Sequence, residues 1–288
     1  MPFNEININL NQPDLGTLEG QYFDEFILGY ERNIRDQFKV ALRGTYRRLG
    51  QVLKPGINPE TNVWMVGNPG SGSLDFLPQL ERDYQAVEIS LQKSASRRFN
   101  FLTSYVLSRN SGNYTGLFNL ETGAAIANLG SVPLLPLQIP NGNGLLPNDR
   151  THVFKFSGSY RTDIGLTAGA SFFWQSGTPI TELGIFPSIF PVFYFLSKRG
   201  STGRTSAITD LSVRLKYDLG RLASRGFNAS LILDGLHLLN QRNVTEVDQV
   251  HFQGVDENDN PIAPNPNYLN PVGFEPARTV RLGMEVKF

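Results

Sequence analysis

The C-terminal end of the chain alternates apolar and polar positions without interruption. Between 279 and 288 the apolar set consists of Val280, Leu282, Met284, Val286 and Phe288. A period of two residues indicates a β-strand, with one apolar face and one face that carries charges. Such a strand fits between lipid and a water-filled interior. This segment alone does not exclude one alternative to a membrane strand, the edge strand of a soluble β-sandwich.

The same alternation recurs along the chain and predicts eight further strands, each about ten residues long. They lie near 22–30, 38–46, 87–92, 99–105, 154–161, 166–175, 210–217 and 227–234. Together these segments predict an all-β fold with about nine strands. Because the apolar phase is kept from strand to strand, we expect one continuous apolar surface.

The predicted connections alternate between short and long. Short ones fall at 33–37, 94–98, 162–165 and 220–226, and long ones at 54–80, 111–150, 178–204 and 241–276. Loops beyond about 15 residues are uncommon in soluble domains, whereas outer-membrane barrels combine short periplasmic turns with long extracellular loops. The sequence therefore predicts an antiparallel, up-and-down transmembrane β-barrel segment over 1–288, with the long loops outside the cell and irregular.

Composition excludes several other classes of protein. Lys plus Arg equals Asp plus Glu at 26 each and no dense basic run appears, so nucleic acid is not an expected partner. The chain has no cysteine, which excludes disulfides and thiolate metal sites. No apolar run is long enough for a membrane helix, and the first residues lack the features of a signal peptide. We therefore expect that residue 1 lies inside a longer precursor.

The last eight residues resemble the C-terminal assembly signal of outer-membrane proteins. Arg281, Gly283, Val286 and Phe288 occupy its polar, glycine, hydrophobic and terminal aromatic positions. Beyond it, the stretches 26–50, 84–118, 149–179 and 274–288 resemble the C-terminal barrel of Oar-like TonB-dependent receptors, which carry an N-terminal carboxypeptidase-regulatory-like domain.

This resemblance implies a location in the bacterial outer membrane and a barrel of about 22 strands around a folded plug. It also implies partners: outer-membrane lipid, the barrel-assembly machinery acting on the last strand, the missing plug and N-terminal strands, and TonB through that missing part. We expect energy-coupled uptake or export of an unidentified solute, with no catalytic residue, cofactor or metal in this chain.

Candidate ligand contacts are the exposed aromatic and acidic groups expected on the long loops. They are Trp64, Tyr114, Phe195, Asp256 and Asp259. The oxygen-rich run 256–260 has ligands that calcium prefers. It lacks the glycine and the distal glutamate of a helix-loop-helix calcium site, so a solvated turn is favoured. The glycine-rich run 67–73 has no following lysine and does not predict a phosphate-binding loop.

Two other functions compete with a receptor. An autotransporter translocator or a porin-like barrel also has a membrane barrel, but a translocator needs about twelve strands and a helix in its pore. An outer-membrane hydrolase would use one of the three histidines, His152, His237 and His251, with a nucleophile and an orienting group. No local motif supports such a triad, and His152 shares the phase of Phe154, which places it at the outer rim.

Overall fold

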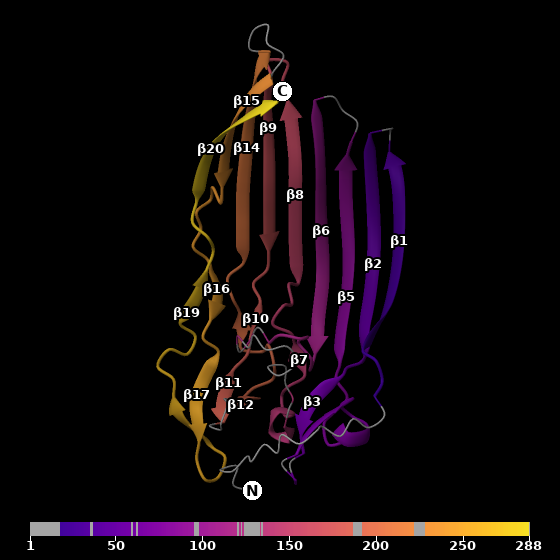
Figure 1. Ribbon diagram of the computed structural model, residues 1–288, viewed down its shortest axis with the longest axis vertical. Coiled ribbons are helices and arrows are strands. Elements are labelled where there is room, and N and C mark those ends of the chain that lie inside the picture. The colour runs from indigo at the N-terminus through magenta and orange to yellow at the C-terminus, as the bar shows by residue number, and fades with distance from the viewer. Residues whose placement is uncertain are drawn as a thin grey trace.

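Nine long antiparallel strands form one sheet in the computed structural model (Figure 1). The structure describes residues 18–34, 37–58, 60–61, 63–94, 98–119, 121, 123, 133, 135–186, 192–221 and 228–287. The sheet contains, in spatial order, β1 (Tyr22–Ile34), β2 (Phe38–Gln51), β5 (Arg82–Lys93), β6 (Phe99–Gly112), β8 (His152–Arg161), β9 (Leu166–Gln175), β14 (Ile208–Arg221), β15 (Asn228–Leu236) and β20 (Thr279–Lys287). Spatial order equals chain order, so the predicted up-and-down arrangement of nine strands is confirmed.

The strand register confirms the two predicted faces. Residues that face each other across neighbouring strands share a side of the sheet. One unbroken apolar row runs Leu42, Ile89, Tyr105, Phe154 and Trp174 over five strands. The opposite side carries charge pairs, because Arg43 faces Glu88 and Arg214 faces Asp234. We call these sides the apolar face and the polar face.

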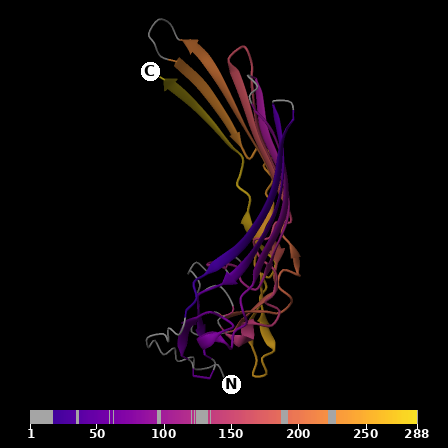
Figure 2. The same ribbon diagram turned by 90° about the vertical axis from the view of Figure 1, so that its right-hand side faces the viewer.

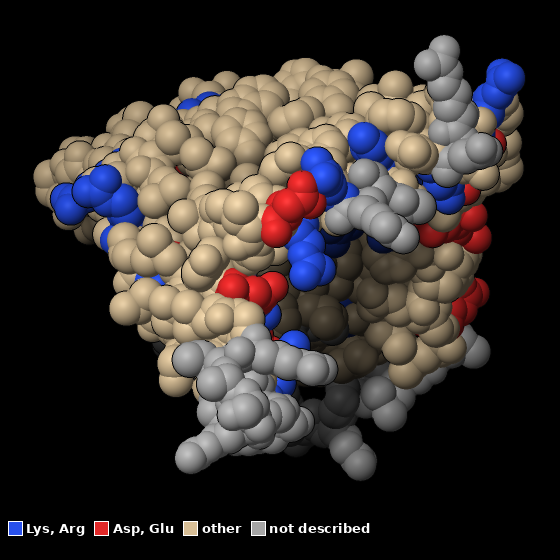
Figure 3. All heavy atoms as spheres, turned by 90° about the horizontal axis from the view of Figure 1, so that it is seen from above, with Lys and Arg blue, Asp and Glu red and all other residues tan. Residues whose placement is uncertain are grey.

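The sheet is curved like part of a barrel wall (Figure 2). Viewed from the turn end, charged side chains gather around the hollow, and the broad surface beside it is mostly uncharged (Figure 3). On the apolar face Val280, Leu282 and Met284 are 65%, 79% and 66% exposed. A soluble sandwich would bury these side chains against a second sheet, so the exposure contradicts that alternative.

The long connections lie together at one end of the sheet, where they form an ordered layer (Figure 1). Its elements are β3 (Lys54–Ile57), β4 (Trp64–Gly67), β7 (Gly144–Leu145), β10 (Pro179–Ile180), β11 (Leu183–Phe186), β12 (Val192–Phe195), β13 (Gly203–Arg204), β16 (Val244–Val247), β17 (Val250–Val255), β18 (Pro261–Pro264), β19 (Pro271–Phe274) and the 3₁₀ helices η2 (Gly72–Leu74) and η3 (Pro136–Gln138). The expectation of irregular loops is wrong, because β11 pairs in parallel with β17 from the next long loop.

The hydrophobic core lies mainly in this loop layer and not on the sheet. One buried cluster joins Leu49, Val52, Leu80 and Tyr114, and a second joins Ile57, Leu135 and Val192. No second layer covers either face of the sheet in the described part of the chain, so the long strands remain exposed. None of the described helices is long and apolar enough to cross a membrane.

The sheet has two free edges. Within the described residues β1 pairs only with β2, and β20 pairs only with β15. Unpaired strand edges present rows of backbone N–H and C=O groups that need partners. In a lipid environment such groups have no water to bond.

Candidate functional site

The predicted aromatic contacts are not exposed as expected. Tyr114 is only 1% exposed and packs with Leu49 and Leu80, and burial raises the pKa of its hydroxyl. Trp64 is partly buried against the cluster of Ile57, Leu135 and Val192. Both rings therefore pack in the core of the loop layer; the expected exposure is wrong for Tyr114, and Trp64 is only partly exposed.

Phe195 is also buried, at 5% exposure, and packs on Leu183 in a third cluster. The Arg199 guanidinium lies over its ring, 4.7 Å from the centroid. Phe195 nevertheless contributes to the wall of a cavity of about 300 Å³ within the loop layer, together with Gln138 and Asn143. Its exposure was predicted wrongly, and its role in ligand contact stays a prediction.

The two predicted acidic contacts lie in the tight turn between β17 and β18. Asp256 accepts hydrogen bonds from the backbone N–H groups of Asn258 and Asn260, at 2.8 and 2.9 Å. The Asn260 side chain also donates to it and is the main cause that lowers the pKa of the Asp256 carboxyl. Asp259 is exposed, with a positive φ of 62°. The carboxylate of Asp256 therefore organises the turn itself, and Asp259 alone of the pair points freely to solvent.

A different feature offers a binding site: a cavity of about 450 Å³ on the polar face, beneath the loop layer. Arg47, Tyr84 and Asn110 lie directly opposite one another on β2, β5 and β6 and form one side of it. Its lining comprises Phe23, Arg47, Arg82, Tyr84, Val106, Ser108, Asn110, Asn148, Arg150, Val153 and Lys155. We call it the basic cavity, because four of these described residues are cationic and none is acidic.

Most cations of the basic cavity are held in place by contacts with the protein. Arg82 Nη1 donates to the Thr115 carbonyl at 3.0 Å, and Arg150 Nη1 donates to the Ser176 carbonyl at 2.7 Å. These acceptors are neutral, so the positive charges are oriented without being cancelled. Burial lowers the pKa of the Arg150 guanidinium, and the nearby charge of Arg204 adds to this effect.

Sequence reasoning missed this cavity. Arg47 continues the polar phase of Lys39 and Arg43, and Lys155 alternates with Phe154 and Phe156, so the face of both residues can be read from the sequence. Arg82 and Arg150 lie outside the strands that alternation predicted, and nothing local connects them with Lys155. Only the strand register brings all four together.

The three histidines have defined partners. His152 Nδ1 lies 2.7 Å from the Tyr105 hydroxyl, and its ring stacks on Tyr105 and Trp174 at the loop end of the apolar face. His237 bonds Asp210 at 2.8 Å, and His251 bonds Glu182 at 2.6 Å. A His–carboxylate pair supplies the base and the orienting group of a triad, and catalysis also needs a nucleophile placed at that base. The position of His152 at the outer rim matches its prediction.

Comparisons with known proteins give a relative over nearly the whole chain. No family model matches it. The TonB-dependent transporter Oar of Myxococcus xanthus is 29% identical over 307 residues, which cover 94% of this chain and 28% of Oar. The resemblance to Oar-like receptors is confirmed. This chain spans less than a third of that relative's length.

Two solved structures share the fold of this chain. The outer membrane transporter YddB from Escherichia coli has a TM-score of 0.52 at 12% identity, over 93% of this chain and 32% of YddB. The ferric-catecholate import receptor Fiu from E. coli has a TM-score of 0.54 at 11% identity, over 93% of this chain and 28% of Fiu. At such identities the likeness concerns the fold alone. Together with the likeness to Oar, the two-faced sheet indicates the β-barrel fold of the bacterial outer membrane.

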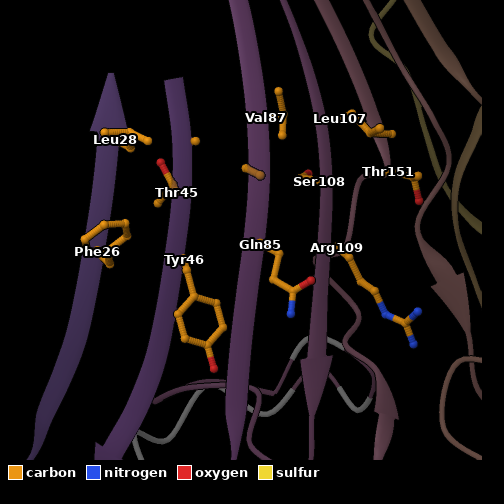
Figure 4. Close-up of a pocket in the computed structure, with 12 residues that line it drawn as sticks. Phe26, Leu28, Thr45, Tyr46, Gln85, Val87, Leu107, Ser108, Arg109 and Thr151 are labelled. Carbon is orange, nitrogen blue, oxygen red and sulfur yellow. The ribbon is translucent and has the colours of Figure 1, made fainter. Parts of the chain in front are cut away.

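The apolar face of the sheet has a shallow groove of about 650 Å³ across β1, β2, β5 and β6. Figure 4 shows Leu28, Val87 and Leu107 at one level, with Tyr46, Gln85 and Arg109 nearer the loops. Gly44 faces both Leu28 and Val87 and has no side chain to fill the space between them. Apolar side chains at the level of Leu28 and polar groups nearer the loops match a membrane-facing surface that meets lipid acyl chains first and lipid headgroups further out.

Three residues of the predicted assembly signal, Arg281, Gly283 and Val286, lie on β20 at one edge of the sheet. Gly283 faces Ile232 and Val286 faces Ala229 on β15, whereas Arg281 points to the polar face and contacts Asp234 at 3.4 Å. Phe288 lies outside the described residues. The alternation predicted for this strand is therefore confirmed from Thr279 to Lys287, and its role as an assembly signal stays a prediction.

A buried ion pair joins two of the long loops. The side chains of Arg199 and Glu121 are 0% and 1% exposed, and Arg199 Nε donates to both Glu121 carboxylate oxygens at 3.0 and 3.1 Å. Arg199 Nη1 also donates to the carbonyls of Asn113 and Gly142. Thr181 donates to Glu121 at 2.8 Å. The loop at 113–150 is thereby fastened to the loop at 178–204.

Proposed function

We propose that this chain is part of the wall of an energy-coupled outer-membrane receptor that moves a solute through its barrel. The observation that carries the proposal is the two-faced sheet capped by an ordered loop layer, in a chain related to the transporter Oar. An apolar outer face suits lipid, and a charged inner face suits a wet passage. The relative's description as TonB-dependent favours active transport over an autotransporter or a passive pore.

The free edges of β1 and β20 support a closed barrel in a longer protein. In lipid each unpaired backbone group costs several kcal/mol, so an open sheet of nine strands is not a stable membrane structure. Further strands, pairing with β1 and β20, remove that cost. We infer that a plug inside the completed barrel supplies the contact with TonB, as the family resemblance implies. We also infer that the barrel-assembly machinery engages β20 through its free edge.

The loop layer is the proposed first contact of the solute. It has its own hydrophobic clusters and a cavity of about 300 Å³, and the basic cavity lies directly beneath it on the polar face. A solute that passes from the loops into the barrel would meet Phe195 and the exposed Asp259 region first and the cationic wall second.

Orientation is tested with single cysteines, because the chain itself has none. In intact cells that express the full-length protein, a membrane-impermeant maleimide should label Asp259→Cys and Glu60→Cys on the loops. Asp163→Cys, in the turn between β8 and β9, should react only after the outer membrane is permeabilised. Labelling of Asp163→Cys alone in intact cells would reverse the topology and reject the proposal.

Transport is tested by comparing the medium of three cultures: a deletion strain, the complemented strain, and the complemented strain with a protonophore. We expect at least one solute whose depletion or release requires both the gene and the proton-motive force. Depletion that persists with the protonophore would indicate a passive pore. If no solute depends on the gene, the transport proposal fails.

A further inference from the structure

The basic cavity has an excess of positive charge that the described residues do not neutralise. On the same face the neighbouring carboxylates already have partners, since Glu25 bonds Arg47 and Glu88 bonds Arg43. Asp149, beside Arg150, pairs with Arg204 at 2.5 Å. Arg82, Arg150 and Lys155 therefore face the cavity without a carboxylate partner in the described part of the chain.

A second observation points to a ligand. Asn110 is 6% exposed and lines the cavity, and its Oδ1 atom has no hydrogen-bond partner among the residues that the structure describes. Its other groups are engaged, because Nδ2 donates to Asn148 and the backbone N–H donates to Asp149. A buried carbonyl oxygen without a donor is rare in folded proteins. The cavity thus combines cations with an acceptor that lacks a donor.

We propose that the basic cavity binds an organic anion, a carboxylate or a phosphate ester, whose hydroxyl or amide group donates to Asn110. This inference rests on the proposed transport function, because it names the class of solute that would pass this wall. Arginine suits such oxyanions through paired N–H donors. A volume of about 450 Å³ is in the range of small-molecule sites. Tyr84 and Phe23 add ring surface for the carbon skeleton of the solute.

The first experiment measures the charge and accessibility of the cavity in the full-length protein. Ser108→Cys places a thiol in its wall with little change in size. The rate of an anionic methanethiosulfonate reagent is divided by the rate of a cationic one, after each rate is normalised to that with a small neutral thiol in solution. We expect this ratio to be roughly ten. Cations also lower the pKa of a thiol, but that effect accelerates both reagents and cancels in the ratio.

Lys155→Gln should bring this ratio down toward one, because it removes a cation from the wall. Lys39→Gln is the matched control, since Lys39 lies on the same face near the turn end and pairs with Glu31. A ratio near one in Ser108→Cys without a second substitution would overturn the proposal. If neither reagent reacts, the plug fills the cavity, and the proposed solute site is equally overturned.

The second experiment measures binding to purified full-length protein by calorimetry, with glucose 6-phosphate, citrate and neutral glucose as probes. We expect saturable binding of at least one anion and no binding of glucose. Comparison of glucose 6-phosphate with citrate separates recognition of phosphate from recognition of carboxylate. Lys155→Gln should weaken that binding roughly tenfold, and Lys39→Gln should not. Absence of anion binding, or equal effects of the two variants, would overturn the inference. Neither result depends on the proton-motive force, so it is distinguishable from a failure of the transport proposal.

Discussion

The buried ion pair between Arg199 and Glu121 gives the sharpest stability prediction. Arg199→Met keeps an apolar stem over Phe195 but leaves the Glu121 carboxylate buried with no cation. Breaking a buried ion pair by removing one partner costs about 3–5 kcal/mol. The loops joined by the pair should therefore open more often, by roughly a hundredfold to a few thousandfold.

Hydrogen exchange measured by mass spectrometry reports this opening, because amide protection reflects the free energy of local unfolding. In the full-length protein we expect protection to fall in peptides that cover 135–146 and 192–204. Peptides of the long strands should keep their protection, because the pair lies outside the sheet. A loss below about tenfold in the loop peptides would refute the reasoning.

Two controls separate charge from packing. The double variant Arg199→Met with Glu121→Met should recover most of the lost protection, because apolar replacements of a whole buried pair are often neutral or stabilising. Arg98→Met should have almost no effect, because its partner is Asp163 and both side chains are largely exposed, at 60% and 74%. A double variant less protected than the single one would contradict the account.

Two further predictions concern a buried lysine and the lipid surface. Burial lowers the pKa of Lys54 to about 7 from 10.5, so the unfolded chain binds more protons between these values. The stability of the loop layer should then rise with pH from about 7 to 10, by at most ~1.4 kcal/mol per pH unit. Hydrogen exchange of β3 and β4 at pH 7 and 9 measures this rise, which should vanish in Lys54→Met. On β8, Phe156→Arg should cost about 2–4 kcal/mol on the lipid side and lower the amount of folded barrel on unheated gels, while Ser157→Arg, on the polar face, should not. Equal losses in both variants would contradict the assignment of faces.

The strands were predictable because lipid on one face and water on the other impose a local alternation of apolar and polar residues. Within the membrane each residue faces one solvent or the other, so a period of two appears in the sequence without any knowledge of distant contacts. This alternation ends where a strand leaves the membrane. β5 begins at Arg82, five positions before the first apolar residue of the predicted segment. The predicted strands were therefore correct in number and phase, but β2, β5 and β6 extend further toward the loop layer than predicted.

The basic cavity was not predictable from charge counts. The whole chain is neutral, with 26 cationic and 26 acidic residues, and that balance gives no sign of a local excess. The excess arises because carboxylates such as Glu25, Glu88 and Asp149 each pair with an arginine across strands or loops. Which cations remain without such a partner depends on the register, and the register is a long-range property.

The burial of the aromatic residues on the long loops has a physical reason that applies to membrane barrels in general. In a soluble protein an aromatic residue on a long loop is a fair candidate for ligand contact, because the sheets already supply the hydrophobic core. Here the apolar side chains of the long strands face outward, so the sheet offers the loops no dry interior. A layer of long loops must then bury side chains of its own to stay ordered. Trp64, Tyr114 and Phe195 meet that need, whereas Asp259 lies on a tight turn that builds no core and stays exposed.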